Sequence, residues 1–351
     1  MTRVADWQLG HFAAQTINRA EVDKVEKIPD DGWIRATAYA GILAQYRASG
    51  DTKYLQAGLT WADRNQWQPG SRPRHADDQC VAQAYAELFF LKKDPRMLAG
   101  IRKNFDLMIA EPLWGSVAGW SKSNNWSWCD ALFMAPPAMA RVARATGDTR
   151  YLDLMNRLWW ETHAYLYDPA ERLYYRDANY FIKPDGSGPR TPSGQKVFWG
   201  RGNGWVLAGL ARTLQFLPEE LRDRPRYVAL FCAMAERIAD LQQPEGLWRS
   251  SLNEPAWYPT PETSCSAMFC FALAYGVNTG LLDRARFAPA AENAWRGLLG
   301  CVDAAGKLGF VQLTGHDPRP VFAGDTLDYG PGAFLLAGEQ MLALVEYPPP
   351  R

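Results

Sequence analysis

The sequence lacks several features on which common functions depend. Lys and Arg number 38 and so do Asp and Glu, so the chain has no net charge with which to hold nucleic acid or an anionic membrane. It has only four histidines and no HExxH motif, and its six cysteines include no CxxC pair. That pattern argues against a transition-metal site and against a disulfide framework. We therefore expect no metal, no cofactor and no nucleic-acid partner.

Long hydrophobic segments are also missing. The longest apolar runs are far shorter than the roughly 18 residues that a membrane helix needs. The N-terminal sequence from Met1 to Phe12 lacks the apolar segment of a signal peptide. We expect no membrane partner and a cytoplasmic location, with a periplasmic location as the alternative if a signal peptide has been removed. The sequence leaves the oligomeric state open.

Aromatic side chains, by contrast, are abundant. The chain has 15 Trp, 15 Tyr and 15 Phe, which together make up 13% of its residues. The faces of Trp and Tyr stack on the C–H faces of pyranose rings, so carbohydrate is the first ligand class to consider. The alternative is that Trp fills the core of a large helical protein.

A short motif recurs along the chain. The sequence Ser-Gly-Asp-Thr-Lys-Tyr-Leu at 49–55 returns as Thr-Gly-Asp-Thr-Arg-Tyr-Leu at 146–152, and weaker versions begin at Lys93, Leu221 and Leu281. In each copy a helix ends, often at Gly, and Asp or Thr caps the next helix. Each copy therefore predicts a tight corner between two helices.

Apolar residues recur at helical spacing on both sides of these corners, which predicts about twelve helices in six pairs. The first helices of the pairs are expected at 33–48, 81–91, 132–145, 205–217, 268–277 and 333–345. The others are expected at 2–19, 53–66, 95–109, 150–165, 225–242 and 284–300.

The other connections are long and rich in Trp, Tyr, Gly, Pro and Arg. They cover about 20–32, 67–75, 111–127, 166–202, 244–261 and 301–328. Short corners at one end and long, usually functional, loops at the other are typical of a closed ring of helical hairpins. We expect an all-α (α/α)6 barrel that forms a single domain over 1–351. The alternative, a linear solenoid, would need polar end caps, whereas the last expected helix is apolar.

In such a barrel, the residues that open the inner helices converge on one mouth. They form polar or aromatic clusters at 30–33, 75–79, 126–130, 199–205, 261–264 and 328–332. An isolated Asp at a helix start is more often a cap than a catalytic group. Six such clusters at one end of the barrel favour a functional site there.

Asp130 is the strongest catalytic candidate. It follows Trp126 and Trp128 and precedes the apolar segment 132–137. We expect desolvation to raise its pKa, so that it holds a proton near neutrality as a general acid must. Asp77 and Asp78 form a second acidic position. Neighbours in a helix point about 100° apart, so we expect one to face the cavity and the other to cap or pair.

Arg201 and Asn203 belong to the glycine-rich segment Trp-Gly-Arg-Gly-Asn-Gly-Trp at 199–205. A glycine-rich turn lets backbone and side chains approach a ligand closely, and an arginine there would suit a substrate carboxylate. The segment is not a nucleotide-binding loop, because it lacks the Lys-Ser/Thr pair of a P-loop.

These segments carry a resemblance that covers essentially the whole chain. They resemble glycoside hydrolase family 105, the unsaturated rhamnogalacturonyl hydrolases of pectin degradation, and the related family 88 unsaturated glucuronyl hydrolases. The matching motifs lie at 31–33, 75–78, 128–136, 173–177, 197–205, 262–264 and 329–334. The Trp-x-Asp and Trp-x-Arg-Gly-Asn-x-Trp motifs are specific when they occur together.

The resemblance implies hydration of a 4,5-unsaturated uronic acid at the non-reducing end of a small oligosaccharide that a polysaccharide lyase has made. It implies that Asp130 is the general acid and base, and that Asp77 or Asp78 is a second carboxylate near the double bond. One carboxyl could serve both steps, first as acid and then as base. The expected substrate-binding residues are Trp33, His75, Trp128, Met134, Arg176, Trp199, Arg201, Asn203, Trp205, Glu262, Thr263, Ser264 and Tyr329.

Two positions depart from the family pattern. Arg176 stands where some members have His, and Cys265 stands where Gly is expected. Both departures bear on the preferred uronate and leaving sugar rather than on the reaction.

Three other functions remain open at the level of sequence. An inverting glycosidase would use Asp130 with Asp77 or Asp78, at a separation of roughly 6.5–9.5 Å, on saturated glycosides. A sugar epimerase of similar shape would need facing histidines, and only His75 opens an expected inner helix. A non-catalytic carbohydrate-binding protein would have little reason to bury an acid among tryptophans, because that burial is costly.

Overall fold

The computed structural model describes residues 1–12, 28–112, 117–120 and 126–346. Six helices form a closed inner ring in which α2 contacts α5, then α9, α11, α13 and α15 follow, and α15 returns to α2. Their bounds are α2 (Trp33–Ser49), α5 (Val81–Lys92), α9 (Pro136–Thr146), α11 (Gly200–Leu214), α13 (Thr263–Asn278) and α15 (Tyr329–Glu346). The predicted (α/α)6 barrel is thereby confirmed.

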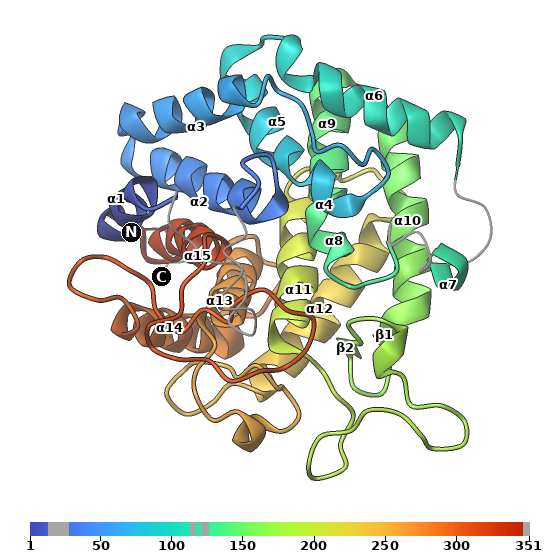
Figure 1. Ribbon diagram of the computed structural model, residues 1–351, viewed down its shortest axis with the longest axis vertical. Coiled ribbons are helices and arrows are strands. Elements are labelled where there is room, and N and C mark those ends of the chain that lie inside the picture. The colour runs from blue at the N-terminus through green and yellow to red at the C-terminus, as the bar shows by residue number, and fades with distance from the viewer. Residues whose placement is uncertain (13–27, 113–116, 121–125, 347–351) are drawn as a thin grey trace.

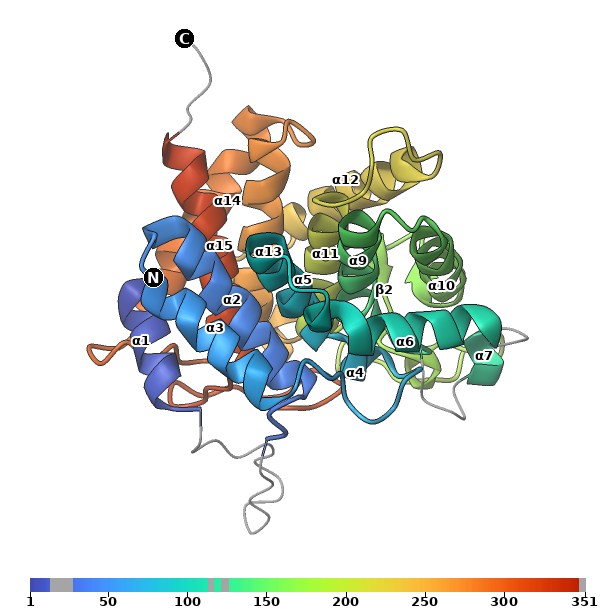
Figure 2. The same cartoon turned by 90° about the horizontal axis from the view of Figure 1, so that it is seen from above.

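The outer helices pack around this ring, and Figures 1 and 2 show them on its outside. They are α1 (Thr2–Gly10), α3 (Thr52–Arg64), α6 (Arg96–Ala110), α10 (Arg150–Leu166), α12 (Arg224–Asp240) and α14 (Arg284–Gly300). The short elements are α4 (Ala76–Gln79), α7 (Val117–Trp120), α8 (Ala131–Met134), η3 (Ala178–Tyr180), η4 (Pro255–Trp257), β1 (Tyr167–Asp168) and β2 (Leu173–Tyr174).

The two layers differ in how much of each helix is buried. In α11 every residue from Gly200 to Leu214 is buried, whereas α3 buries only Tyr54, Gly58, Trp61 and Ala62. A helix that is buried all round belongs in a core, and one with a single apolar stripe belongs at a surface. Burial pattern therefore sorts the helices into inner and outer layers.

Glycine allows α2 and α15 to pack closely where the ring closes. A Cβ atom on Gly41 would lie 2.4 Å from the Gly332 carbonyl oxygen, and one on Gly332 would lie 2.3 Å from the Thr37 carbonyl oxygen. No larger residue fits at either position without separating the helices. This contact joins the first inner helix to the last.

The repeated motif forms the expected corners. Gly50 and Gly147 end α2 and α9 in the left-handed conformation, with φ of 70° and 74°. Directly after them, the carboxylates of Asp51 and Asp148 accept hydrogen bonds from the backbone N–H of Lys53 and Arg150, each at 3.0 Å. Both motifs act as a helix stop followed by a helix start.

Some expected element boundaries were wrong. The helix expected at 132–145 is divided into α8 and α9, because Pro136 has no N–H to continue the hydrogen bonding. The glycine-rich segment at 199–205 is the first turn of α11 rather than an irregular turn. There the glycines permit close packing: a Cβ atom on Gly200 would lie 2.5 Å from the Arg249 carbonyl oxygen.

The loop expected at 166–202 contains the β1–β2 hairpin, which the sequence did not predict. In the helix expected at 2–19, α1 ends at Gly10, and residues 13–19 lie outside the described part of the chain.

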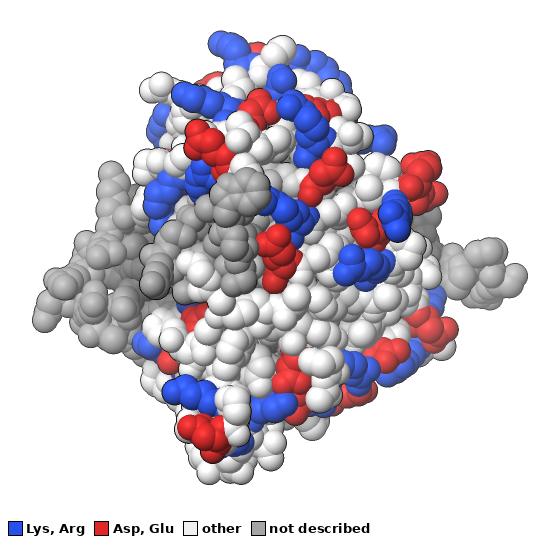
Figure 3. Space-filling view, turned by 90° about the vertical axis from the view of Figure 1, so that its right-hand side faces the viewer, with Lys and Arg blue, Asp and Glu red and all other residues white. Residues whose placement is uncertain are grey.

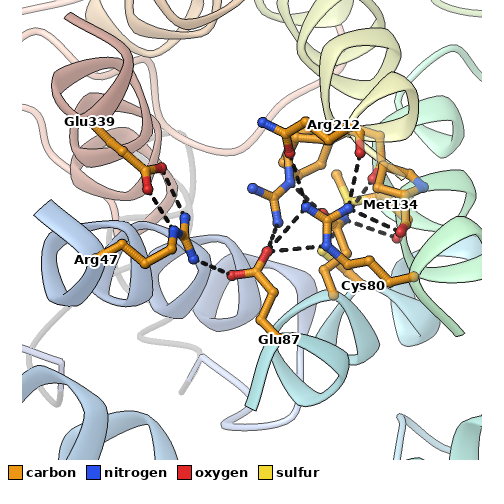
Figure 4. Close-up of polar contacts among 11 residues, drawn as sticks. Arg47, Cys80, Glu87, Met134, Arg212 and Glu339 are labelled. Atoms are coloured by element: carbon orange, nitrogen blue, oxygen red, sulfur yellow. Dashed lines mark hydrogen bonds and ion pairs between the residues drawn. The ribbon is translucent and has the colours of Figure 1, made fainter. Parts of the chain in front are cut away.

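Charged side chains hold the end of the barrel where the inner helices finish. Glu87 of α5 pairs with Arg47 of α2 at 2.6 Å, Arg141 of α9 at 3.1 Å and Arg212 of α11 at 2.9 Å (Figure 4). Arg47 also pairs with Glu339 of α15 at 2.5 Å. Positive charge is favourable here, because the inner helices direct their C-terminal carbonyls at this end. We call this group the closed-end cluster.

The outer surface has no single dominant charge on the face drawn in Figure 3, where acidic and basic side chains are interspersed. Within the described residues, no helix is long and apolar enough to cross a membrane, and no three His, Cys, Asp or Glu side chains are grouped as metal ligands.

Candidate active site

The opposite end of the barrel, where the inner helices begin, is formed partly by two single-turn helices. Helix α4 precedes α5 and helix α8 precedes α9, and α4 and α8 are in contact. Asp77 lies in the first turn of α4, and Asp130 directly precedes α8. The two short helices therefore bring together carboxyl groups that are distant in sequence.

The two carboxyl groups are close enough to influence each other. Burial and then the nearby charge of Asp130 raise the pKa of Asp77 to about 7. Both side chains are largely enclosed, with 21% of Asp77 and 13% of Asp130 exposed. Like charges that share a confined space cannot both ionise easily. This pair therefore holds a proton near neutral pH, as acid–base catalysis requires.

Arg176 lies beside Asp130. Its Nε is 3.5 Å from Oδ2 of Asp130, and its Nη1 donates to Oδ2 of Asp177 at 2.6 Å. Its backbone carbonyl accepts a hydrogen bond from the Cys129 N–H at 2.9 Å, which ties the chain after β2 to the segment that carries Asp130. The sequence led us to expect only apolar and aromatic neighbours for Asp130, and the structure adds a guanidinium.

The carboxylate of Asp78 is bound within the protein rather than free to meet a substrate. Its carboxylate accepts hydrogen bonds from the backbone N–H of Arg72 at 2.7 Å and from Nη2 of Arg72 at 2.5 Å. The loop passes so close that a Cβ atom on Gly70 would lie 2.5 Å from Cγ of Asp78. Of the two adjacent acids, Asp78 fastens this loop, and Asp77 is the one coupled to Asp130.

His75 caps α4 and is buried. Its Nδ1 accepts the backbone N–H of Asp77 at 3.3 Å, and its ring centroid lies 4.9 Å from that of Trp128. Burial, followed by the charge of Arg72, lowers its pKa to about 4, so the ring is neutral at physiological pH. Nδ1 accepts, so the ring proton is on Nε2, for which the described residues offer no hydrogen-bond partner.

Aromatic rings form one wall of the site. Trp33, at the first position of α2, stacks on Tyr329 with a centroid separation of 5.4 Å and meets Trp205 edge to face at 5.9 Å. Tyr329 and Trp205 are fully buried, whereas Trp33 is partly exposed. Trp33 is therefore the ring of this group that is available to stack on a sugar. It also lines a cavity of about 250 Å³ together with Asp31, Arg72 and Asp78.

Arg201 is less available than the sequence suggested. It is 1% exposed, lies over the rings of Trp199 and Tyr329, and donates to the carbonyl oxygens of Gln312 and Leu313. Nε1 of Trp199 donates to the Gln312 side chain at 2.9 Å. Arg201 and Trp199 therefore hold the 312–313 segment in place.

Other predicted binding residues are also buried in protein contacts. Glu262 caps α13 by accepting from the N–H groups of Ser264 and Cys265, and Thr263 donates to the Gly309 carbonyl at 2.7 Å. The Asn203 side chain accepts from the Tyr174 N–H and donates to the Tyr174 and Trp199 carbonyls.

Ser264 and Met134 are likewise buried. The Ser264 hydroxyl donates to the Glu262 carboxylate, and Met134 is 1% exposed. These contacts bury the side chains, and the expected role of these residues in substrate binding stays a prediction.

Sequence reasoning missed Arg72, Asp177 and Gln312. Arg72 and Gln312 lie in long loops without a motif. Gln312 accepts hydrogen bonds from Trp199, Arg201 and Tyr329, and its backbone N–H donates to Glu262; nothing in the sequence indicates these contacts. Asp177 follows Arg176 within the motif at 173–177, so of these three residues it was the one that the sequence could most easily have indicated.

A closed (α/α)6 barrel whose aromatic mouth holds two buried carboxyl groups, one with a raised pKa, defines the class as the six-hairpin glycoside hydrolases. The family model for Glycosyl Hydrolase Family 88 matches residues 1–345, and the chain belongs to this family.

Two curated relatives are both unsaturated 3S-rhamnoglycuronyl hydrolases. The one from Formosa agariphila is 37% identical over 99% of this chain and 90% of its own length. The one from Alteromonas sp. is 32% identical over 96% of this chain and 84% of its own.

Two solved structures share this fold. A family 88 glycosyl hydrolase from Bacteroides vulgatus is 31% identical with a TM-score of 0.81, covering 97% of this chain and 99% of its own. A protein described as a polysaccharide lyase is 29% identical with a TM-score of 0.84, covering 100% of this chain and 99% of its own.

Proposed function

We propose that this glycoside hydrolase releases a 4,5-unsaturated uronic acid from the non-reducing end of lyase-generated oligosaccharides. The reaction begins with a proton added to C4 of the C4=C5 enol ether and a water oxygen added to C5. The resulting hemiketal opens to a ketone at C5, and the hemiacetal left at C1 releases the next sugar. The net change is hydrolysis, with no bond made to the enzyme.

The observation that carries this proposal is the coupled pair of Asp77 and Asp130. The reaction needs one group that holds a proton near neutral pH and one that accepts a proton from water. The raised pKa of Asp77, caused by burial and by the charge of Asp130, meets the first need, and Asp130 is the second carboxyl group available for the other.

The relatives also indicate a substrate class. Both carry a name that joins an unsaturated uronyl unit to rhamnose, so we propose an unsaturated uronyl-rhamnose substrate for this chain. Trp33, which is partly exposed and lines a cavity with Arg72 and Asp78, is the ring on which we expect a sugar to stack.

The reaction can be followed directly, because the conjugated enol ether absorbs ultraviolet light and is destroyed. We expect wild-type protein to reduce this absorbance with unsaturated disaccharides, fastest with a rhamnose leaving group. Asp130→Asn should lower the rate by at least ~1000-fold while the protein stays folded. A folded Asp130→Asn variant with near-wild-type turnover would remove Asp130 from the chemistry.

The similarity to a protein described as a polysaccharide lyase supplies a second candidate function. A lyase creates the unsaturated uronate by elimination, so it would increase the same absorbance when given an intact polysaccharide. The sign of the change therefore separates the two activities in one assay. An inverting glycosidase would be recognised by turnover of saturated glycosides with no absorbance change.

A further inference from the structure

Helix α8 is a single turn, and it begins directly after Asp130. Its four residues, from Ala131 to Met134, are all buried. The backbone N–H groups of Phe133 and Met134 donate to the Asp130 carbonyl at 2.9 and 3.3 Å. One turn has few hydrogen bonds of its own, so contacts with other helices fix its position. Whatever holds Phe133 and Met134 therefore also holds the backbone of Asp130.

The carbonyl groups of α8 lack their usual helical partners. In a continuous helix, the N–H groups of residues 136 and 137 would donate to the carbonyls of Leu132 and Phe133. Pro136 and Pro137 stand there and have no N–H. The Leu132 carbonyl packs closely against α11, where a Cβ atom on Gly209 would lie 2.4 Å from its oxygen. The Phe133 carbonyl needs a donor from elsewhere, because an unpaired buried carbonyl is costly.

Gln83 of α5 supplies that donor. Its buried side chain places Nε2 at 2.7 Å from the Phe133 carbonyl oxygen and at 3.3 Å from that of Met134. Oε1 of Gln83 accepts a hydrogen bond from Nε of Arg212 at 2.6 Å. An arginine N–H can only donate and a carbonyl can only accept, so one orientation of the amide satisfies all three contacts. Gln83 therefore takes the place of a hydrogen bond that the two prolines remove.

The orientation of Gln83 depends on the closed-end cluster. Gln83 and Glu87 lie one turn apart on α5, and Nη2 of Arg212 donates to Oε1 of Glu87 at 2.9 Å. Figure 4 shows Met134 in the same group of contacts as Arg212 and Glu87. Hydrogen bonds therefore run from the cluster through Arg212 and Gln83 to α8, and α8 in turn is bonded to the carbonyl of Asp130.

We propose that Gln83 is a positioning residue for the reaction: its amide holds α8 in place and thereby fixes the position of the Asp130 carboxyl group at the mouth. This rests on the proposed function only in that Asp130 takes part in the chemistry, whichever step it serves. A displacement of about 1 Å at a reacting group can lower a rate about 100-fold. Loss of the Gln83 donor should therefore lower kcat and leave KM nearly unchanged.

Two substitutions separate the donor from the rest of the side chain. Gln83→Met keeps the length of the side chain and removes both contacts. Gln83→Glu keeps an oxygen for Arg212 and removes the donor to the Phe133 carbonyl. We expect kcat of both folded variants to fall by about 10-fold to 100-fold in the absorbance assay, with KM within about 3-fold of wild type. A Gln83→Glu variant with wild-type kcat would show that the donor is not needed, and the proposal would be overturned.

Gln45→Met is the matched control. Gln45 is a buried glutamine of the inner helix α2, and its Nε2 donates to the Thr2 hydroxyl of α1 at 3.3 Å. The substitution removes a buried amide at a site without contact to α8. We expect it to lower the stability and to leave kcat unchanged. An equal loss of kcat in Gln45→Met would mean that the loss follows from stability alone, which would contradict the proposal.

Hydrogen exchange tests the position of α8 without a substrate. The N–H groups of Phe133 and Met134 should exchange about 10-fold faster in Gln83→Met than in wild type, and at the wild-type rate in Gln45→Met. Unchanged exchange in Gln83→Met would overturn the proposal even if kcat falls. Failure of wild-type protein on every unsaturated substrate would instead count against the proposed function, and the exchange rates would still decide whether Gln83 holds α8.

Discussion

The two ends of the barrel place buried carboxyl groups in opposite surroundings. At the closed end, burial opposes ionisation of Glu87, but Arg47, Arg212 and Arg141 outweigh it and lower the pKa of Glu87 to about 2. At the mouth, burial and Asp130 raise the pKa of Asp77 to about 7. Both carboxyls are enclosed by the same six-helix ring, so burial alone does not decide their state.

The difference separates stability from function. Each guanidinium of the closed-end cluster meets Glu87, so one carboxylate holds together the three helices that carry them and its own. At the mouth, burial and the charge of Asp130 outweigh Arg72 and Arg176, which costs stability but keeps a proton available on Asp77. Carboxyl groups whose pKa is raised, as that of Asp77 is, are typical of catalytic sites.

The largest effect is expected at the closed end. Glu87→Gln leaves three guanidiniums without their shared anion, and removing one partner of a buried ion pair costs about 3–5 kcal/mol. Urea unfolding would measure this loss. The matched control is Glu339→Gln, which removes a more exposed partner of Arg47 and should cost less than about 1 kcal/mol. Equal effects of the two substitutions would show that Glu87 is not the centre of the cluster.

Acid should act on the closed end first. The pKa of Glu87 is lowered in the folded state, so its contribution is complete above the unfolded-state pKa near 4.5 and is lost as pH falls toward about 2. The shift corresponds to about 3 kcal/mol. Unfolding free energies of wild type and Glu87→Gln, measured from pH 6 down to pH 2, should therefore converge. Parallel curves would contradict the lowered pKa.

At the mouth, Trp33→Ala should affect substrate binding more than folding. The ring is partly exposed and stacks on Tyr329, so its removal takes away the expected sugar platform. We expect KM to rise about 10-fold, which is about 1.4 kcal/mol, with a smaller change in kcat. A steady-state comparison with Trp160→Ala, whose partly exposed ring packs against Tyr227 between the outer helices α10 and α12, would show whether any loss is specific to Trp33.

The effect expected for Asp77 has the opposite sign. The pKa of Asp77 is raised in the folded state, so folding stability falls as pH rises from about 4 to about 7 and the cost remains above that range. Asp77→Asn removes this cost. We expect the variant to be inactive but more stable than wild type at pH 8, by up to about 4 kcal/mol, with no gain at pH 4. A variant that is less stable at pH 8 would show that Asp77 stabilises the fold as an anion.

Much of the fold could be predicted because its signals are local. The corners at Gly50 and Gly147 follow from a helix stop and a cap within a few residues. The break between α8 and α9 also has a local cause, Pro136. It was not predicted, because the apolar residues continue at helical spacing on both sides of the proline.

The site was predictable only in part. The sequence placed Asp77, Asp130 and Trp33 at helix starts, and the structure gathers them at one mouth. The sequence gave no indication that the side chains of Arg201 and Asn203 donate hydrogen bonds to backbone carbonyl groups. Those contacts depend on loop conformations, which hydrophobic periodicity does not encode.

The amino-acid sequence by itself determined the helical hairpins and their tight corners, because capping and periodicity act over a few residues. Only the tertiary structure decided the charge states of the carboxyls. The partners of Glu87 lie 40, 54 and 125 residues away in the chain, and Arg176 reaches Asp130 from a different hairpin. A pKa is set by what lies within a few ångströms, and that neighbourhood exists only after folding.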